Sequence, residues 1–378
     1  LSLNATREPP PQLGVFTDGE GMSALNRFHG NLDDLAYLRD LTSAAAYWIR
    51  SEARTLILGA GAGADIFQAI VHGARRIDAV ELNPQVVELV ERDLAEFSGK
   101  PYSQPEVSLR LGEARGFVAS TRERYDLIQV GLLDSAAASS AGLYALSEGY
   151  LYTVEALRLY LNRLAPAGLL SITRWVNLPP RDTLKLFATA VTALERDGIR
   201  DPGERLVLIR GWRTATLLVK NGAFTPEEID ALRVFCRQRS FDFGWYPRMP
   251  AAEANRYNQL DQAYFHEGAA ALLGPQRAEF IERYKFNIAP ATDDRPYFHR
   301  FFRWTAAPEL LRLRERGGLP LLEWGYPLLV MTLLQASVFA MALVLLPVRR
   351  LGRTRSAASS ESGWQIACYF AALGLAFL

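Results

Sequence analysis

The stretch of sequence that decides the fold is TLILGAGAGADIFQAIVHGARRIDAVELN, residues 55–83. An apolar strand is followed by Gly59, Gly61 and Gly63, then by a helical pattern and a second strand that ends at Glu81. Glu81 follows Gly61 by twenty positions. This spacing is expected when a glycine turn binds a nucleotide at a helix start and the carboxylate after the next strand binds the ribose. The sequence therefore predicts a nucleotide-binding α/β protein.

Each of these residues also has a purely structural interpretation. Glycines permit tight packing between a strand and a helix, and a carboxylate at a strand end can be a solvated cap. The spacing favours ligand binding for the glycines and for Glu81. Asp65 lies one turn into the predicted helix, where it either contacts an amino group of the ligand or caps the helix; the sequence leaves both open.

Strand and helix patterns alternate after residue 54, which predicts right-handed crossovers and a parallel sheet covered on both faces. Two further strands, 206–210 and 214–220, are joined by only three residues. That connection is too short for a crossover helix, so we expect an antiparallel hairpin. The arrangement resembles the class I methyltransferase version of the doubly wound, Rossmann-like α/β sheet and disfavours a nicotinamide-dependent dehydrogenase. The expected elements are strands 55–59, 76–82, 106–111, 125–131 and 168–174, and helices 63–73, 84–97, 115–121, 147–164 and 181–197.

The regions on either side of the sheet differ in character. Residues 1–33 suit a small β segment, and 33–50 an amphipathic helix. Helical patterns cover 226–239, 251–273 and 275–286. The expected domains are a β/α lead-in (1–50), a nucleotide-binding domain (51–222), a helical appendage (223–320), a transmembrane helix (325–348) and the start of a second one (364–378).

The transmembrane prediction rests on residues 327–348, which are apolar and uncharged for about 22 residues. A helix of that length crosses a hydrocarbon core of roughly 30 Å. The alternative is a buried core helix. Because residue 1 is not Met and the chain stops within an apolar run, we expect a fragment of a longer protein.

Composition excludes several classes of function. With 42 Lys plus Arg and 41 Asp plus Glu, the net charge of +1 provides no field to attract nucleic acid. Two cysteines and four histidines without ligand spacing exclude a disulfide framework and a zinc site of recognisable type. We therefore expect no metal, and chemistry that comes from carboxylates, hydroxyls, arginine and a bound cofactor.

Further carboxylates follow the strands. Glu113 comes after the third strand, where it would accept from an exocyclic amine of a base or, alternatively, begin a helix. Glu148 and Tyr150 are candidates for lining a substrate pocket, although an aromatic residue here can also belong to the core. Asp293 and Asp294 either close over a cationic substrate or form an internal salt bridge.

Taken together, these motifs resemble the spermidine synthase family over roughly residues 12–220. The resemblance implies a transferase that uses S-adenosylmethionine or its decarboxylated form and passes a methyl or aminopropyl group to a small amine, possibly a polyamine. Two further runs, SEGYLYTVEA (147–156) and ATDDRPYF (291–298), resemble membrane-embedded bacterial relatives, which implies an inner-membrane protein. A cytosolic cofactor predicts that the soluble part faces the cytoplasm, whereas the arginines that follow the predicted span favour the opposite orientation. The motifs are GAGAG (59–63), VELN (80–83), GEA (112–114), YDLI (125–128) and LDS (133–135).

The chain departs from the family at two acidic positions. Ala62 replaces an Asp that holds the aminopropyl ammonium, and Gly131 replaces the Asp base at the end of the fourth strand. Asp134 is the acidic position of that loop that remains, so we expect it to be catalytic; the alternative is a loop cap. A second hypothesis is therefore a catalytically silent, nucleotide-binding regulatory module of a membrane protein.

Overall fold

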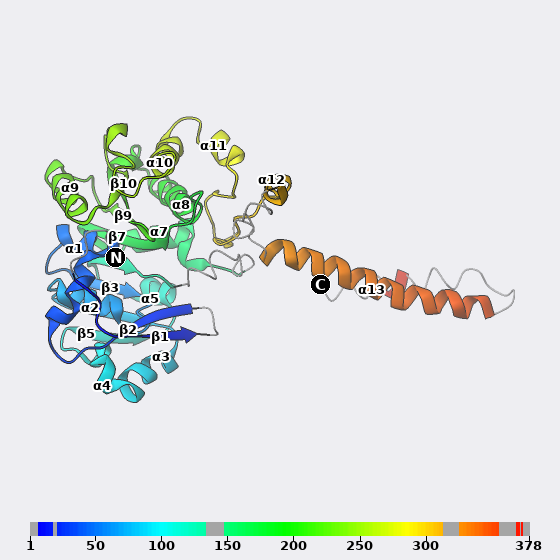
Figure 1. Ribbon diagram of the computed structural model, residues 1–378, viewed down its shortest axis with the longest axis horizontal. Helices are drawn as coiled ribbons and strands as arrows, with labels where there is room; N and C mark the ends of the chain where they lie inside the picture. The colour runs from blue at the N-terminus through cyan, green and yellow to red at the C-terminus, as the bar shows by residue number, and fades with distance from the viewer. Residues whose placement is uncertain are drawn as a thin grey trace. The chain divides into compact units, whose positions relative to one another are not determined.

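The computed structural model describes residues 7–17, 21–133, 147–312, 325–354, 368–370 and 372. The chain divides into two compact units, Leu1–Glu323 and Trp324–Leu378. The first unit contains the sheet and the candidate site, and the second contains the long apolar helix (Figure 1).

Eight strands of the described residues form one sheet in the order β10-β8-β9-β7-β6-β3-β4-β5. The five strands from β5 to β7 run parallel, and β9, β8 and β10 are antiparallel to their neighbours. This order confirms the predicted doubly wound sheet with its terminal hairpin. The strands are β3 (Arg54–Leu58), β4 (Arg76–Glu81), β5 (Val107–Leu111), β6 (Tyr125–Val130), β7 (Leu164–Trp175), β8 (Leu206–Arg210), β9 (Thr214–Lys220) and β10 (Asp242–Trp245).

Helices cover both faces of the sheet because alternate strand residues point in opposite directions. On β3, Leu56 and Leu58 belong to one apolar cluster and Ile57 to the other. The first cluster includes residues of α5 (Ala114–Ser120), α7 (Val154–Leu161), α8 (Asp182–Arg196) and α10 (Tyr264–Leu273). The second includes residues of α1 (Ala45–Ile49), α2 (Ala64–Val71), α3 (Pro84–Glu88) and α9 (Pro226–Arg239).

The direction of winding changes between β3 and β6. From β3 the chain moves outward to β4 and β5, and then returns to place β6 on the other side of β3. Ligands of open α/β sheets bind at such a switch point, outside the carboxyl ends of the strands. The fold therefore places the candidate site where Gly59 follows β3 and Gly131 follows β6.

The predicted β segment of the lead-in is a hairpin of β1 (Gln12–Thr17) and β2 (Gly21–Asn26). The predicted amphipathic helix 33–50 is wrong: the chain forms 3-10 turns over Leu32–Asp40 and Thr42–Ala44 before the short α1. Four consecutive residues, 35–38, are buried. One face of an α-helix cannot bury four successive side chains. The packing of these residues therefore excludes the α-helix that the amphipathic pattern predicts.

The region after β9 also differs from its prediction. The short strand β10 joins the edge of the sheet, so this region is not purely helical. The expected helix 251–273 reduces to a 3-10 turn, Ala251–Glu253, and to α10. Asp242 is the reason, because its carboxylate accepts the backbone N–H groups of Arg256, Tyr257 and Asn258 and holds them outside a helix. The helix 275–286 shortens to α11 (Arg277–Arg283).

Two more predicted helices are interrupted. Residues 84–97 form α3, a π turn over Leu89–Asp93 and α4 (Ala95–Ser98). Residues 147–164 begin with a 3-10 turn, Tyr150–Tyr152, before α7. This second interruption places Glu148 and Tyr150 before the helix, on the segment that borders the site. The last helix of the first unit's described residues is α12 (Ala307–Arg312).

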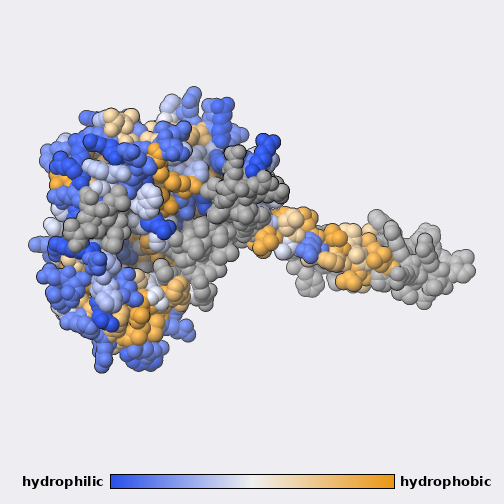
Figure 2. Space-filling model, in the orientation of Figure 1, coloured by the Kyte–Doolittle hydropathy of each residue, from blue (hydrophilic) through white to orange (hydrophobic). Residues whose placement is uncertain are grey.

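In the second unit, α13 (Gly325–Thr354) contains the 21-residue segment Tyr326–Leu346, whose mean hydropathy is 2.4. Its length and composition are sufficient to cross a membrane, and its described surface is largely apolar (Figure 2). The second predicted transmembrane helix, 364–378, lies outside the described residues except at 368–370 and 372.

Candidate functional site

A pocket of about 290 Å³ lies at the predicted edge of the sheet. Its walls come from the β1–β2 hairpin, the glycine loop after β3 and the segments that follow β4, β5 and β6. The pocket therefore occupies the switch point. The lining residues are Val15, Thr17, Ser23, Gly59, Gly61, Val80, Glu81, Leu82, Asn83, Val86, Gly112, Glu113, Ala114, Leu132, Leu133 and Leu151.

The glycine loop has the conformation that its sequence predicts. Gly59, Gly61 and Gly63 have φ angles of 76°, 53° and 91°, in the left-handed region that favours glycine. At Gly61 a side chain is also excluded by space, because a Cβ there would lie 2.5 Å from Oγ of Ser23. The hairpin therefore packs directly on the loop and forms one wall of the pocket.

Glu81 is held in place by the backbone. Its Oε2 accepts the N–H of Gly61 at 2.8 Å, and its Oε1 accepts the N–H of Asn83, also at 2.8 Å. The side chain is 8% exposed and lines the pocket. Each carboxylate oxygen retains accepting capacity beyond these bonds. The carboxylate predicted to bind the ribose is thus fixed at the end of β4, and its contact with a ribose stays a prediction.

Glu113 has a structural role as well as a place in the pocket. As N-cap of α5, its carboxylate accepts the backbone N–H groups of Arg115 at 2.8 Å and of Gly116 at 2.5 Å. This is the helix-start alternative left open by the sequence. Because Glu113 also lines the pocket, its contact with a nucleobase stays a prediction.

Asp65 does not cap α2 with its side chain. Its Oδ1 accepts from Nε2 of Gln129 at 2.8 Å, and Oε1 of Gln129 accepts from the hydroxyl of Tyr47 at 2.6 Å. Burial raises the pKa of Asp65 to about 6, against a smaller lowering by the Gln129 hydrogen bond. Asp65 is therefore a partly buried carboxylate near the switch point that takes up a proton close to neutral pH.

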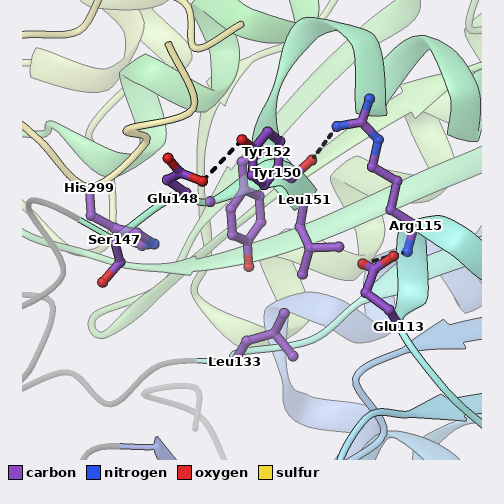
Figure 3. Close-up of a pocket in the computed structure, with 10 residues that line it drawn as sticks. Glu113, Arg115, Leu133, Ser147, Glu148, Tyr150, Leu151, Tyr152 and His299 are labelled. Atoms are coloured by element: carbon purple, nitrogen blue, oxygen red, sulfur yellow. Dashed lines mark hydrogen bonds between the residues drawn. The ribbon is translucent and has the colours of Figure 1, made fainter. Parts of the chain in front are cut away.

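A larger pocket of about 600 Å³ adjoins the first, with which it shares Glu113, Leu133 and Leu151. In Figure 3, Glu148 and Tyr150 lie close together on the segment before α7. The hydroxyl of Tyr150 donates to Oε2 of Glu148 at 3.0 Å, and this bond raises the pKa of Tyr150. The lining residues are Glu113, Arg115, Leu133, Ser147, Glu148, Gly149, Tyr150, Leu151, Tyr152 and His299.

Asp293 forms an ion pair with Arg115, the internal alternative that the sequence left open. Two nitrogens of Arg115 donate to its two carboxylate oxygens, and the hydroxyl of Thr153 donates to Oδ1 at 2.7 Å. The hydrogen bond from Arg115 lowers the pKa of Asp293. Asp294 is exposed. Neither carboxylate lines either of the two pockets described above, and their contact with substrate stays a prediction.

The two departures from the family pattern have different surroundings. Ala62 is buried at 1% exposure in an apolar cluster with Val15, Leu25 and Val90, beneath the hairpin. Gly131 lies next to Asp65 at the carboxyl end of β6. The predicted catalytic residue Asp134 lies outside the described residues. Within the described residues, no group of three or more His, Cys, Asp and Glu side chains could hold a metal.

Sequence reasoning missed Ser23 and Tyr102. The hydroxyl of Ser23 accepts the N–H of Ala62 at 2.9 Å, and the hydroxyl of Tyr102 donates to the carbonyl of Gly61 at 2.6 Å. These residues fix the glycine loop from two distant segments, and no local pattern in the sequence marks them.

The comparison with protein families agrees with this geometry. The model of the spermine/spermidine synthase domain matches residues 34–171. Over this region the chain is similar to the spermidine synthase family. The matched region covers the glycine loop, Asp65, Glu81 and Glu113, and ends within β7.

Two curated relatives are similar to part of this chain. The polyamine aminopropyltransferase of Korarchaeum cryptofilum is 28% identical over 102 residues, 27% of this chain and 32% of that protein. That of Sulfolobus acidocaldarius is 27% identical over 138 residues, 36% of this chain and 46% of that protein. The chain thus spans between about a third and a half of the length of these relatives.

Solved structures also match. A spermidine synthase from Thermotoga maritima has 14% identity and a TM-score of 0.40, covering 71% of this chain and 86% of that one. A probable spermidine synthase from Corynebacterium glutamicum has 18% identity and a TM-score of 0.42, covering 61% and 87%.

Proposed function

We propose that this protein is a membrane-tethered transferase that binds S-adenosylmethionine or its decarboxylated form and passes an aminopropyl or methyl group to a small amine. The observation that carries the proposal is Glu81, held by the N–H groups of Gly61 and Asn83 at the wall of the 290 Å³ pocket. A carboxylate in this position at a switch point is suited to accept from ribose hydroxyls. The polyamine aminopropyltransferase names of the curated relatives support the same reaction class.

The two adjoining pockets suit a two-substrate reaction. The adenosyl compound occupies the pocket beside Glu81, and the acceptor occupies the larger pocket that contains Glu148 and Tyr150. A sulfonium is intrinsically electrophilic, so the protein has to align the acceptor nitrogen and manage one proton. Glu148 is exposed, and its carboxylate is suited to attract a cationic amine.

The glycine loop favours the decarboxylated cofactor. The N–H of Gly61 donates to Glu81, that of Ala62 to Ser23 and that of Gly63 to the carbonyl of Ala60. These amides are therefore already engaged and do not readily bind the carboxylate of S-adenosylmethionine. Because Asp65 adds negative charge near this loop, aminopropyl transfer is the better supported of the two reactions.

Two groups of residues keep their predicted roles within this proposal. Asp134, which follows the end of β6 by four positions in the sequence, binds the acceptor amine. Asp294 approaches the substrate from the segment after α11, where Asp293 is engaged by Arg115. Exchange of each aspartate for asparagine, with the Michaelis constant for the amine as readout, tests these roles.

The membrane part of the proposal rests on α13. The segment Tyr326–Leu346 crosses the bilayer, and the first unit faces the cytoplasm, where adenosyl cofactors are found. A cysteine introduced at the exposed residue Glu123 tests the orientation in intact bacterial cells. We expect no reaction with a membrane-impermeant maleimide until the cells are opened; labelling of intact cells would place the unit on the other side.

Binding is tested with the full chain in detergent. Thermal unfolding is followed while S-adenosylmethionine, its decarboxylated form or a nicotinamide dinucleotide is added. A ligand present at a hundred times its dissociation constant stabilises the folded state by about 2.7 kcal/mol. We expect this from the decarboxylated compound and none from the dinucleotide. Stabilisation by neither adenosyl compound would show that the proposal is wrong.

A nucleotide-binding module without catalysis is the second candidate, favoured by the apolar surroundings of Ala62. Product analysis separates the two. The transferase forms an alkylated amine and the corresponding adenosyl thioether, whereas the module binds the adenosyl compound and forms neither. Candidate diamines and triamines are assayed with the parent protein and with Asp134→Asn; unchanged turnover in that variant would remove Asp134 from the mechanism.

A further inference from the structure

Gly131 directly follows β6, and its backbone does not adopt the left-handed conformation that favours glycine. Because its φ angle is not positive, its backbone conformation would allow a side chain. Space excludes one instead: a Cβ at residue 131 would overlap Oδ2 of Asp65, and the Cγ of Asp65 would lie 3.4 Å away. The carboxylate of Asp65 therefore fills the volume into which a side chain at residue 131 would project.

The location of this volume matters because β3 and β6 flank the switch point. The carbonyl oxygen of Gly59 lies 3.8 Å from the same Cβ position, and Gly59 lines the 290 Å³ pocket. Leu132, the residue after Gly131, also lines that pocket. A carboxylate that belongs to α2 thus takes the place beside the crevice that a carboxylate at the end of β6 would have.

The surroundings of Asp65 fix one carboxylate oxygen and give the other no hydrogen-bond donor among the described residues. Oδ1 accepts from Gln129, whose Nε2 also donates to Oε1 of Gln68 at 3.1 Å, while Gln68 donates to the carbonyl of Leu38 at 2.9 Å. Among the described residues, none donates a hydrogen bond to Oδ2. The buried amides orient Asp65 so that Oδ2 faces Gly131.

On these observations, and resting on the transferase function proposed above, we propose that Asp65 is the general base of the reaction, in place of a side chain at residue 131. The acceptor enters as an ammonium and gives one proton to Oδ2. Its nitrogen lone pair then forms a C–N bond to the carbon next to the sulfonium, while the C–S bond breaks and its electron pair stays on sulfur. The products are a secondary ammonium, a neutral thioether and a proton, which Asp65 releases to solvent.

Three tyrosines and one histidine share the surroundings of this carboxylate. Tyr37, Tyr47 and Tyr102 all have pKa values raised above the usual range, chiefly by burial, so they remain neutral near pH 6. His72 stacks on Tyr47 with ring centroids 4.9 Å apart, and burial lowers its pKa. Asp65, whose pKa is about 6, is therefore the group expected to cause the rise of kcat/KM with pH below pH 6, which we call the acid limb. His72→Asn serves as a control.

The test uses the full chain in detergent, with the decarboxylated cofactor and the best diamine or triamine substrate. We expect kcat/KM of the parent protein to rise about tenfold per pH unit up to about pH 6 and then to level off. Asp65→Asn should lower kcat about 100-fold or more at pH 7.5 and abolish that limb. His72→Asn should keep the limb.

Two further variants keep the inference testable if Asp65→Asn does not fold. Gly131→Ala retains the carboxylate but places a methyl group against Oδ2, so we expect at least a tenfold loss of kcat. The matched control is Gly274→Ala, which also lacks positive φ and would have Ala270 O as its nearest neighbour at 3.3 Å. Asp65→Ala combined with Gly131→Asp moves a carboxylate into the same space from β6, and should recover at least tenfold over Asp65→Ala alone.

The possible failures are distinguishable. Turnover by the parent protein with an unchanged rise of kcat/KM below pH 6 in Asp65→Asn would overturn the role of Asp65 and leave the transferase function intact. If Asp65→Asn does not fold, an unchanged kcat in Gly131→Ala would have the same consequence. Binding of the cofactor without product from any amine would remove the transferase function, and the role of Asp65 with it. Loss of the acid limb in His72→Asn would show that His72, and not Asp65, is the group that titrates.

Discussion

The two sides of the crevice hold their carboxylates in different ways. On the cofactor side, Glu81 is fixed by two backbone N–H groups from residues near the strand ends. On the acceptor side, Glu148 is exposed and bonded to Tyr150, while Asp293 is engaged by Arg115, a residue 178 positions away in the chain. Backbone N–H groups therefore hold the carboxylate on the cofactor side, and side chains hold those on the acceptor side. Changes on the two sides should separate cofactor affinity from acceptor affinity.

The largest effect is expected at Glu81. Glu81→Gln weakens the acceptor that the two backbone N–H groups share with, in our proposal, the ribose hydroxyls. Charge-assisted hydrogen bonds contribute about 1.5–3 kcal/mol each, so we expect the dissociation constant of the adenosyl compound to rise about 100-fold. Isothermal titration calorimetry measures it.

The matched control is Glu123→Gln, an exposed carboxylate that pairs with Arg54 near the start of β6. It should leave the affinity unchanged. Equal affinities for the parent and Glu81→Gln would contradict the placement of the ribose, and with it the cofactor side of the comparison.

The next effect concerns the Arg115–Asp293 pair. Asp293→Asn leaves Arg115 without its carboxylate partner and weakens the bond from Thr153, so we expect the free energy of unfolding to fall by about 2 kcal/mol. The value is discounted because both side chains are partly exposed, at 23% and 37%. Chemical denaturation measures it, with the double-mutant cycle through Arg115→Met giving the coupling between the two residues.

The same variant sharpens the comparison between the two sides. If the pair only attaches the segment after α11 to α5 and α7, the dissociation constant of the cofactor stays unchanged, and the KM of the amine rises through a distorted pocket. A weaker cofactor affinity with an unchanged KM for the amine would place the Arg115–Asp293 pair on the cofactor side.

Asp65 gives a smaller effect of opposite sign on stability. Its pKa is raised from 3.8 to about 6 in the folded state. Between about pH 4 and pH 6 the folded protein binds more protons than the unfolded chain, so stability falls as pH rises through this window. Asp65→Asn removes that fall. We expect it to gain about 1–2 kcal/mol relative to the parent between pH 4 and pH 7.5.

Thermal or chemical unfolding of both proteins at the two pH values provides the measurement. A difference that does not change with pH would show that Asp65 does not titrate in this window. A variant that is more stable at pH 7.5 and catalytically impaired would show that the charged carboxylate is retained for its function.

Much of the fold was predictable because its signals are local. The β8–β9 hairpin follows from a three-residue connection, and α9 begins at the Thr225 capping box that the sequence shows. Glu81 and the glycine loop were found by their spacing. Their positions at the sheet edge are confirmed, whereas their contacts with a ligand are still predictions.

The elements that were missed depend on distant contacts. The strand β10 forms on an edge, with Asp242 paired to Arg210, and the interruptions of the predicted helices arise from similar contacts. The relation between Asp65 and Gly131 is of the same kind, because it joins the first turn of α2 to the end of β6. No periodicity within either segment marks it.

The smallest predicted effect is that of Tyr150→Phe. Tyr150 is 41% exposed, and its hydroxyl donates to Glu148, which is also exposed. Removing the hydroxyl should therefore change the free energy of unfolding by less than about 0.5 kcal/mol. Loss of this bond frees Glu148 to move, which should raise the KM of a cationic amine about three- to fivefold and leave cofactor affinity unchanged. Steady-state kinetics with Trp212→Phe, an exposed aromatic beyond the pocket linings, as control tests this. A change in cofactor affinity instead would place Tyr150 on the cofactor side of the crevice.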